Sequence, residues 1–170
     1  MKNTAYILLL GLCFIITSCG DKENKEDNSA SQDTAVASYK QLPEIKPISN
    51  EKLTEINKWK KFKELSNLME KFQDQNSGDL TYFAEEFIRL DTEIEKDSLF
   101  PEKFNVPDVK SRLVVFKTFS NQFKTRLDEN APIDSINVSR EKLLVTYNAI
   151  RQQLSETLKS KIYQDFIKEK

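Results

Sequence analysis

The sequence contains no histidine among its 170 residues. Histidine is the base of Ser-His-Asp and Cys-His catalytic sites, and a common ligand of zinc, copper and iron in proteins. Its absence excludes those catalytic sites and those metal sites in their usual forms. A catalyst built from this chain would depend on carboxylates, Lys, Tyr, Ser and Thr alone. We therefore expect a protein that is not an enzyme and that binds no cofactor.

Two features with which proteins usually recognise phosphate groups are also missing. The chain has 3 glycines, and Gly78 is the only one after Gly20, so it lacks the glycine-rich loops that cradle phosphates. The 26 basic and 27 acidic residues nearly balance, which gives a formal net charge of −1. Nucleic-acid-binding domains are usually strongly basic, and we expect no nucleic-acid partner.

The N-terminus carries the most specific signal in the chain. Lys2 precedes an apolar run over residues 5–16, which is shorter than the roughly 20 residues needed to span a bilayer. A basic start, a short apolar stretch and small residues at its end are typical of a secretory signal peptide. The run ends in the sequence ITSC, residues 16–19.

This ending resembles the bacterial lipobox, in which an aliphatic residue and two small residues precede an obligatory cysteine. The resemblance implies cleavage between Ser18 and Cys19, a diacylglyceryl group on the Cys19 sulfur, and acylation of the new amine by a fatty acid such as palmitate. Several acyl chains hold a protein on a membrane, since each buried methylene contributes about 0.8 kcal/mol. Because Cys13 is lost with the signal peptide, the mature chain has no cysteine left for a disulfide framework.

The residues after Cys19 bear on which membrane holds the protein. Gly20 stands where an aspartate would, by resemblance to the enteric rule, retain a lipoprotein in the inner membrane. The charged residues 20–27 resemble the segments that direct some Bacteroidetes lipoproteins to the cell surface. We expect a lipid-anchored protein of the cell outer membrane, with the choice between its periplasmic and external faces left open.

The chain after the lipobox divides into a tether and a domain. Residues 20–48 are mostly polar and charged, and such a segment buries too little apolar surface to offset the entropy lost on ordering. We therefore predict a signal peptide over residues 1–18, a lipidated cysteine with a flexible, disordered tether over residues 19–48, and a helical domain over residues 49–170.

Four segments after residue 48 place apolar residues at three- and four-residue spacing, which is typical of amphipathic helices. They cover about residues 49–75, 79–95, 107–131 and 135–166. Signals for β-strands are weak. Because these apolar stripes can bury one another only by packing together, and the connections are short, we predict an all-α, up-down-up-down four-helix bundle.

The connection between the second and third expected helices carries four large apolar residues, Leu99, Phe100, Phe104 and Val106. One interpretation is that they cover the end of the bundle core. The other is that they form an exposed patch for a protein partner. The sequence leaves both open.

Three short stretches resemble the Asp-Ser/Thr-aliphatic motif of general O-glycosylation in Bacteroidetes. They are centred on Thr34, Ser98 and Ser135, all in the predicted tether or connections, where an enzyme could reach them. The alternative is that Asp and Ser stand there because they favour turns and helix caps.

The function indicated by these features is a membrane-anchored cell-envelope lipoprotein that acts as a non-enzymatic protein-binding or scaffolding module. Its expected partners are the membrane, through the lipid, and an envelope protein. An alternative is a carrier that holds a small apolar ligand in a bundle core rich in phenylalanine, since the chain has 11 of these residues. A third and weaker interpretation is an enzyme built on carboxylates.

Overall fold

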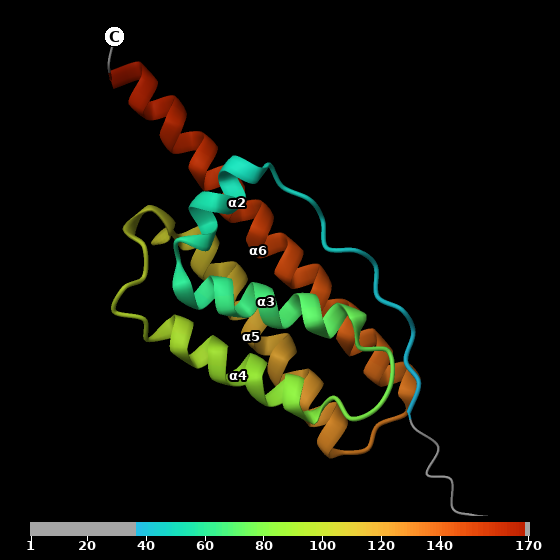
Figure 1. Ribbon diagram of the computed structural model, residues 1–170. Coiled ribbons are helices and arrows are strands. Elements are labelled where there is room, and N and C mark those ends of the chain that lie inside the picture. Colours follow the sequence, from blue (N-terminus) through green and yellow to red (C-terminus); the bar gives the residue numbers. More distant parts are fainter. Residues whose placement is uncertain (1–36, 169–170) are drawn as a thin grey trace, which may run out of the picture. The chain divides into compact units, whose positions relative to one another are not determined.

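The computed structural model describes residues 37–168, with side chains described for residues 37–159. The helices of this part are α2 (Asn50–Asn57), α3 (Lys60–Asp74), α4 (Thr81–Glu95), the 3-10 helix η1 (Glu102–Phe104), α5 (Pro107–Asp128) and α6 (Ile133–Lys168) (Figure 1). No strand occurs within residues 37–168, which confirms the all-α class. None of these helices is both long and apolar enough to cross a membrane.

The first expected helix is broken into α2 and α3. Trp59 has an extended backbone (φ −79°, ψ 98°), and its side chain is only 2% exposed. The indole ring lies 4.4 Å from the ring of Phe100, and its N–H donates to Asp97 over 3.0 Å. The break lets α2 pack against α6 while α3 packs against α4. The described helices therefore number five rather than four.

The other helix ends follow local signals in the sequence. Gly78 has φ +85°, a left-handed conformation that suits glycine, and Asp79 Oδ1 accepts a hydrogen bond from the Thr81 N–H (2.8 Å) at the start of α4. Pro107 is the first residue of α5, where its missing N–H costs no helical hydrogen bond. These positions agree with the expected helix boundaries.

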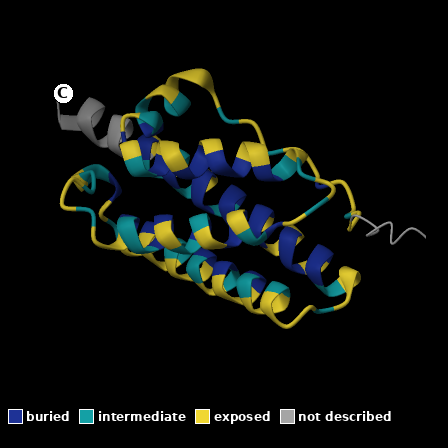
Figure 2. Ribbon diagram, turned by 60° about the horizontal axis from the view of Figure 1, so that its bottom comes forward, coloured by how far each residue is buried: buried dark blue, intermediate teal, exposed yellow. Residues whose placement is uncertain are grey.

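The core is built around phenylalanine rings. Phe72 of α3 lies 5.1 to 5.4 Å from the rings of Phe83 and Phe87 of α4 and of Phe123 of α5, a range at which aromatic pairs attract each other. Helix α5 packs against both α4 and α6. Each helix is buried along one side and exposed along the other (Figure 2), as the apolar spacing predicted.

Residues 37–48, which we call the strap, run along α6 before α2 begins (Figure 1). The Lys40 N–H donates to Asn137 Oδ1 (3.0 Å), and Arg140 donates to Lys40 O (2.7 Å). Further along the strap, the Lys46 N–H donates to Asn148 Oδ1 (3.0 Å), and Arg151 donates to Lys46 O (2.7 Å). We call these two Asn-x-x-Arg pairs the clamps.

The strap is thus part of the described helical domain, although the sequence placed it in the tether. The clamps lie eleven residues apart, close to three helical turns, so both face the same side of α6. The clamps bind backbone atoms of the strap, and the strap residue Leu42, which lies between the two bound positions, is buried at 6% exposure. The rest of the predicted tether and the signal peptide lie outside the described residues.

Candidate functional site

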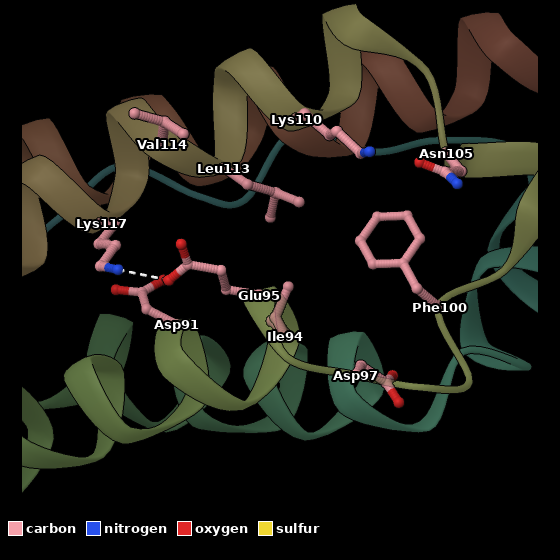
Figure 3. Close-up of a pocket in the computed structure, with 10 residues that line it drawn as sticks. All are labelled: Asp91, Ile94, Glu95, Asp97, Phe100, Asn105, Lys110, Leu113, Val114 and Lys117. Atoms are coloured by element: carbon pink, nitrogen blue, oxygen red, sulfur yellow. Dashed lines mark hydrogen bonds and ion pairs between the residues drawn. The ribbon is translucent and has the colours of Figure 1, made fainter.

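A cavity of about 440 Å³ opens between α4, α5 and the connection that joins them. Ile94 of α4 and Leu113 of α5 point toward each other across its middle, and the Phe100 ring closes one end (Figure 3). Asp91 and Lys117 lie at the other end. The remaining lining residues are Glu95, Asp97, Asn105, Lys110 and Val114. Six of the ten lining residues are polar or charged and four are apolar, so the cavity combines apolar contact area with groups that can orient a ligand.

Asp91 is the most unusual group in this cavity. Its side chain is 5% exposed, and its Oδ2 has no hydrogen-bond partner among the described residues. Burial raises the pKa of this carboxyl to about 7, against smaller opposing effects of a hydrogen bond with Ser120 and of the Lys117 charge. A buried carboxyl that titrates near neutral pH and faces a cavity is a candidate functional group.

Ser120 shows how the protonated carboxyl is accommodated. The Ser120 hydroxyl is 0% exposed and donates to Phe116 O over 3.1 Å. A hydroxyl has one proton and two lone pairs, so Ser120 can accept a hydrogen bond from the protonated Asp91 or turn to donate to the ionised carboxylate, and the second arrangement lowers the carboxyl pKa. Asp91 can therefore donate to Ser120 when it is protonated, and Oδ2 still lacks a partner.

Glu95 and Lys117 form an ion pair beside Asp91, with 2.5 Å between Oε2 and Nζ (Figure 3). Their hydrogen bond lowers the pKa of Glu95 and raises that of Lys117. Lys117 is thus held by Glu95 across the gap between α4 and α5. The Asp91 carboxyl is left without a direct ion-pair partner.

The structure separates the four apolar residues of the 97–106 connection. Phe104 is 0% exposed and packs beneath Trp59, with 6.1 Å between the ring centres, whereas Leu99 is 78% exposed. Phe100 and Val106 are partly buried against the core, and Phe100 also lines the cavity. Phe104 therefore covers the end of the core. Leu99 remains exposed at the surface, and Phe100 remains open to the cavity.

The candidate modification sites fall in different environments. Ser98 is exposed in the connection after α4. Ser135 lies in the first turn of α6 rather than in a loop, and its N–H donates to Pro132 O (2.8 Å). Thr34, together with Ser18 and Cys19 of the lipobox, lies outside the described residues.

Asp91 was not among the candidate residues that the sequence indicated. The spacing does contain a signal, because Phe87, Asp91 and Ile94 follow each other at four- and three-residue intervals and are all buried. The paired Asn-x-x-Arg clamps of α6 were also missed, although their eleven-residue repeat can be found in the sequence.

No set of three Cys, His, Asp or Glu residues within the described part of the chain is arranged to hold a metal ion. The chemistry that the cavity offers is therefore that of a buried carboxyl, an ion pair and apolar walls. Comparisons with protein-family models, curated proteins and solved structures found no match to this chain.

Proposed function

We propose that this chain is a lipoprotein of the cell outer membrane, anchored through Cys19, whose helical domain is a non-enzymatic binding module. The lipobox resemblance of residues 16–19 supports the anchor. The cavity between α4 and α5 supports the binding role, and it is the observation that carries the proposal. The partner would dock over this cavity and the adjacent 97–106 connection.

The surface around the cavity has the composition of a small binding site. Val114, which lines the cavity, is 64% exposed, and Leu99 in the connection is 78% exposed. Apolar residues gathered beside a cavity with a polar rim are typical of interaction sites. A partner that covered them would bury the apolar residues and shield the Glu95–Lys117 pair from water.

We also infer that α3, α4, α5 and α6 form an up-down-up-down four-helix bundle, with α2 as an added short helix. Successive helices of this set pack against each other. A contact between α6 and α3, the last and first helices of this set, would close the bundle. It is supported by the stacked rings of Phe62 and Tyr147, 6.0 Å apart, and by the hydrogen bond from Arg140 to Gln75 O. This arrangement would give the cavity rigid helical walls.

Site-specific photo-crosslinking in living native cells tests the binding role. A photoreactive amino acid replaces Val114 in one strain and Val145 of α6 in another. The two valines are 64% and 59% exposed, and only Val114 lines the cavity. We expect one dominant envelope protein to be crosslinked from position 114 and not from position 145. Equal crosslinking from both positions, or none from position 114, would contradict the proposal.

The anchor is tested separately by Cys19→Ala. We expect the variant to lose its lipid and to move from the membrane fraction to the soluble fraction. A variant that stayed membrane-bound and was still cleaved after residue 18 would exclude lipidation at Cys19 as the anchor.

The alternative role, a carrier of a small apolar ligand, has one observation in its favour, namely the volume of the cavity. At about 440 Å³ it falls within the range of small-molecule sites. The core phenylalanines instead pack on one another, as Phe72 does on Phe87 at 5.1 Å. A carried ligand would thus lie between α4 and α5. Organic extraction of the natively purified protein, followed by mass spectrometry, tests this role.

A further inference from the structure

We propose that the cavity between α4 and α5 binds a primary amine on an apolar stem, with the ammonium group paired to Asp91. This inference rests on the binding role proposed above and names the chemistry that the site recognises. Three observations carry it: the unpaired oxygen of Asp91, the order of groups along the cavity, and the balance of charge around it.

The first observation is that Asp91 Oδ2 is buried without a hydrogen-bond partner. A buried polar atom without a partner is destabilising, and few such atoms occur in folded proteins. In Figure 3 the Asp91 carboxyl faces the space between the two helices, on the same side as the ion pair. Oδ2 itself has almost no accessible surface, so the carboxyl would turn toward the cavity to accept a hydrogen bond from a donor there, and a cationic donor would also supply the missing charge.

The second observation is the order of side chains along the cavity. Asp91 lies at one end, Ile94 and Leu113 face each other in the middle, and the Phe100 ring lies at the far end (Figure 3). A molecule with a cationic head and an apolar body fits this order, because its body would contact the aliphatic walls and its end would reach an aromatic ring.

The third observation is the charge that lines the cavity from each neighbouring element, of which Lys117 and Glu95 lie beside Asp91 and Lys110 and Asp97 lie toward the Phe100 end (Figure 3). Helix α4 contributes Glu95, helix α5 contributes Lys117 and Lys110, and the connection contributes Asp97. Glu95 neutralises Lys117 by direct pairing at 2.5 Å. Asp97 accepts hydrogen bonds from Leu99 N and Trp59 Nε1. With Asp91 ionised, the cavity holds three carboxylates and two ammonium groups, and this excess favours a cation over an anion.

The amine should bind more tightly as the pH rises, because only the ionised carboxylate attracts an ammonium group. With a carboxyl pKa of about 7, the ionised fraction increases from roughly a tenth at pH 6 to roughly nine tenths at pH 8, so the apparent affinity should increase about tenfold. A neutral ligand of the same shape should show no such increase.

The test uses the full-length protein in phospholipid nanodiscs and three probes of similar size: 2-phenylethylamine, 2-phenylethanol and 3-phenylpropionate. Calorimetric titration measures binding, with empty nanodiscs as the blank. Trp59 fluorescence is a second readout, because this single tryptophan contacts Phe100 at the cavity wall. We expect the amine to bind at least tenfold more tightly than the alcohol at pH 8, and the carboxylate to bind most weakly.

Two variants assign the effect to Asp91. Asp91→Asn keeps the size of the side chain and removes its charge, and it should bind the amine and the alcohol equally at every pH. Asp74→Asn makes the same chemical change at an exposed carboxylate outside the cavity, and it should behave as the unaltered protein does. Circular dichroism of each variant verifies that it is folded.

The inference is overturned if the amine binds no better than the alcohol, if the carboxylate binds most tightly, or if Asp91→Asn retains the preference for the amine. Its failure can be distinguished from that of the binding role. If the same partner is still crosslinked from position 114 in cells that carry Asp91→Asn, the docking site stands and only the proposal of an amine at Asp91 fails.

The amine could belong to a free small molecule or to a lysine side chain of the docked protein, and two further measurements separate these sources. Organic extraction of the natively purified protein would recover a free amine. If a lysine of the partner occupies the cavity, acetylating the lysines of the purified partner should abolish its binding to this protein. The proposed chemistry is overturned if no amine is recovered and acetylation has no effect.

Discussion

The pH dependence of stability offers a direct test of the environment of Asp91. The perturbation is Asp91→Asn, which replaces the carboxyl by a neutral group of nearly the same shape. In the folded chain, burial raises the pKa of this carboxyl from 3.8 to about 7. In the unfolded chain the carboxyl is solvated and ionises near its ordinary value. Between these two pH values the folded state holds a proton that the unfolded state has released.

The sign and size of the effect follow from this difference. The stabilising contribution of the protonated carboxyl is fully present below about pH 4, and it is lost as the pH rises toward 7. The loss is about 1.4 kcal/mol per pH unit, or on the order of 4 kcal/mol over the whole interval. The asparagine variant has no such group. Its free energy of unfolding should therefore increase relative to the unaltered protein by this amount between pH 4 and pH 7.5.

The assay is urea unfolding at pH 4, 5, 6, 7 and 8, followed by the fluorescence of Trp59, which is buried in the folded state. Other carboxylates titrate in both proteins and cancel in the difference. Asp79→Asn is the matched control, because hydrogen bonding to Thr81 lowers the pKa of Asp79. Its effect should have the opposite sign, because a carboxyl whose pKa is lowered by folding stabilises the folded state as the pH rises. Parallel curves for Asp91→Asn and the unaltered protein would refute the reasoning.

Three further predictions concern other parts of the domain. Phe104→Ser should lower the free energy of unfolding by about 3–5 kcal/mol, because Phe104 is fully buried. Leu99→Ser, at an exposed site of the same connection, should change the free energy of unfolding by less than about 0.5 kcal/mol. Urea unfolding of both variants checks these values. Gly78→Ala should cost about 1 kcal/mol, since φ is +85° there, and a neutral thermal melt would contradict this. Asn148→Ala should speed hydrogen exchange of the Lys46 amide roughly fivefold, as expected for about 1 kcal/mol lost with one hydrogen bond. Unchanged exchange would mean that this contact does not hold the strap.

Local sequence signals predicted most of the helices well. Gly78 and Pro107 act through their own backbone, and Asp79 acts through a side-chain hydrogen bond to the N–H two residues on, so their effect on helix ends can be inferred without knowledge of the rest of the fold. The break at Trp59 could not be inferred in this way. It depends on Phe100 and Asp97, which are about forty positions further along the chain and become neighbours only after folding.

The candidate site shows the same division between local and distant causes. The apolar residues of the 97–106 connection were found from composition, but their separation into buried Phe104 and exposed Leu99 depends on where Trp59 lies. Asp91 was not found from the sequence, because it stands among the charged residues of its helix and aspartate is rarely buried. The strap was assigned to the tether because the segment 20–48, taken as a whole, is mostly polar and charged. It is held instead by side chains of α6 that bind its backbone atoms, and by apolar residues at every third position, of which Leu42 is buried and Tyr39, Ile45 and Ile48 pack against the core.

The clamps also determine the order in which the chain can fold. They join strap and helix residues that are 97 to 105 positions apart in the chain. At a synthesis rate of about 5–20 residues per second, the strap is made on the order of ten seconds before the residues that bind it. Closing so long a loop is also slow relative to pairing neighbouring helices. The part of the strap from Lys40 to Lys46, which the clamps bind, is thus expected to dock last, and a chain interrupted before α6 would leave it with no clamp to bind.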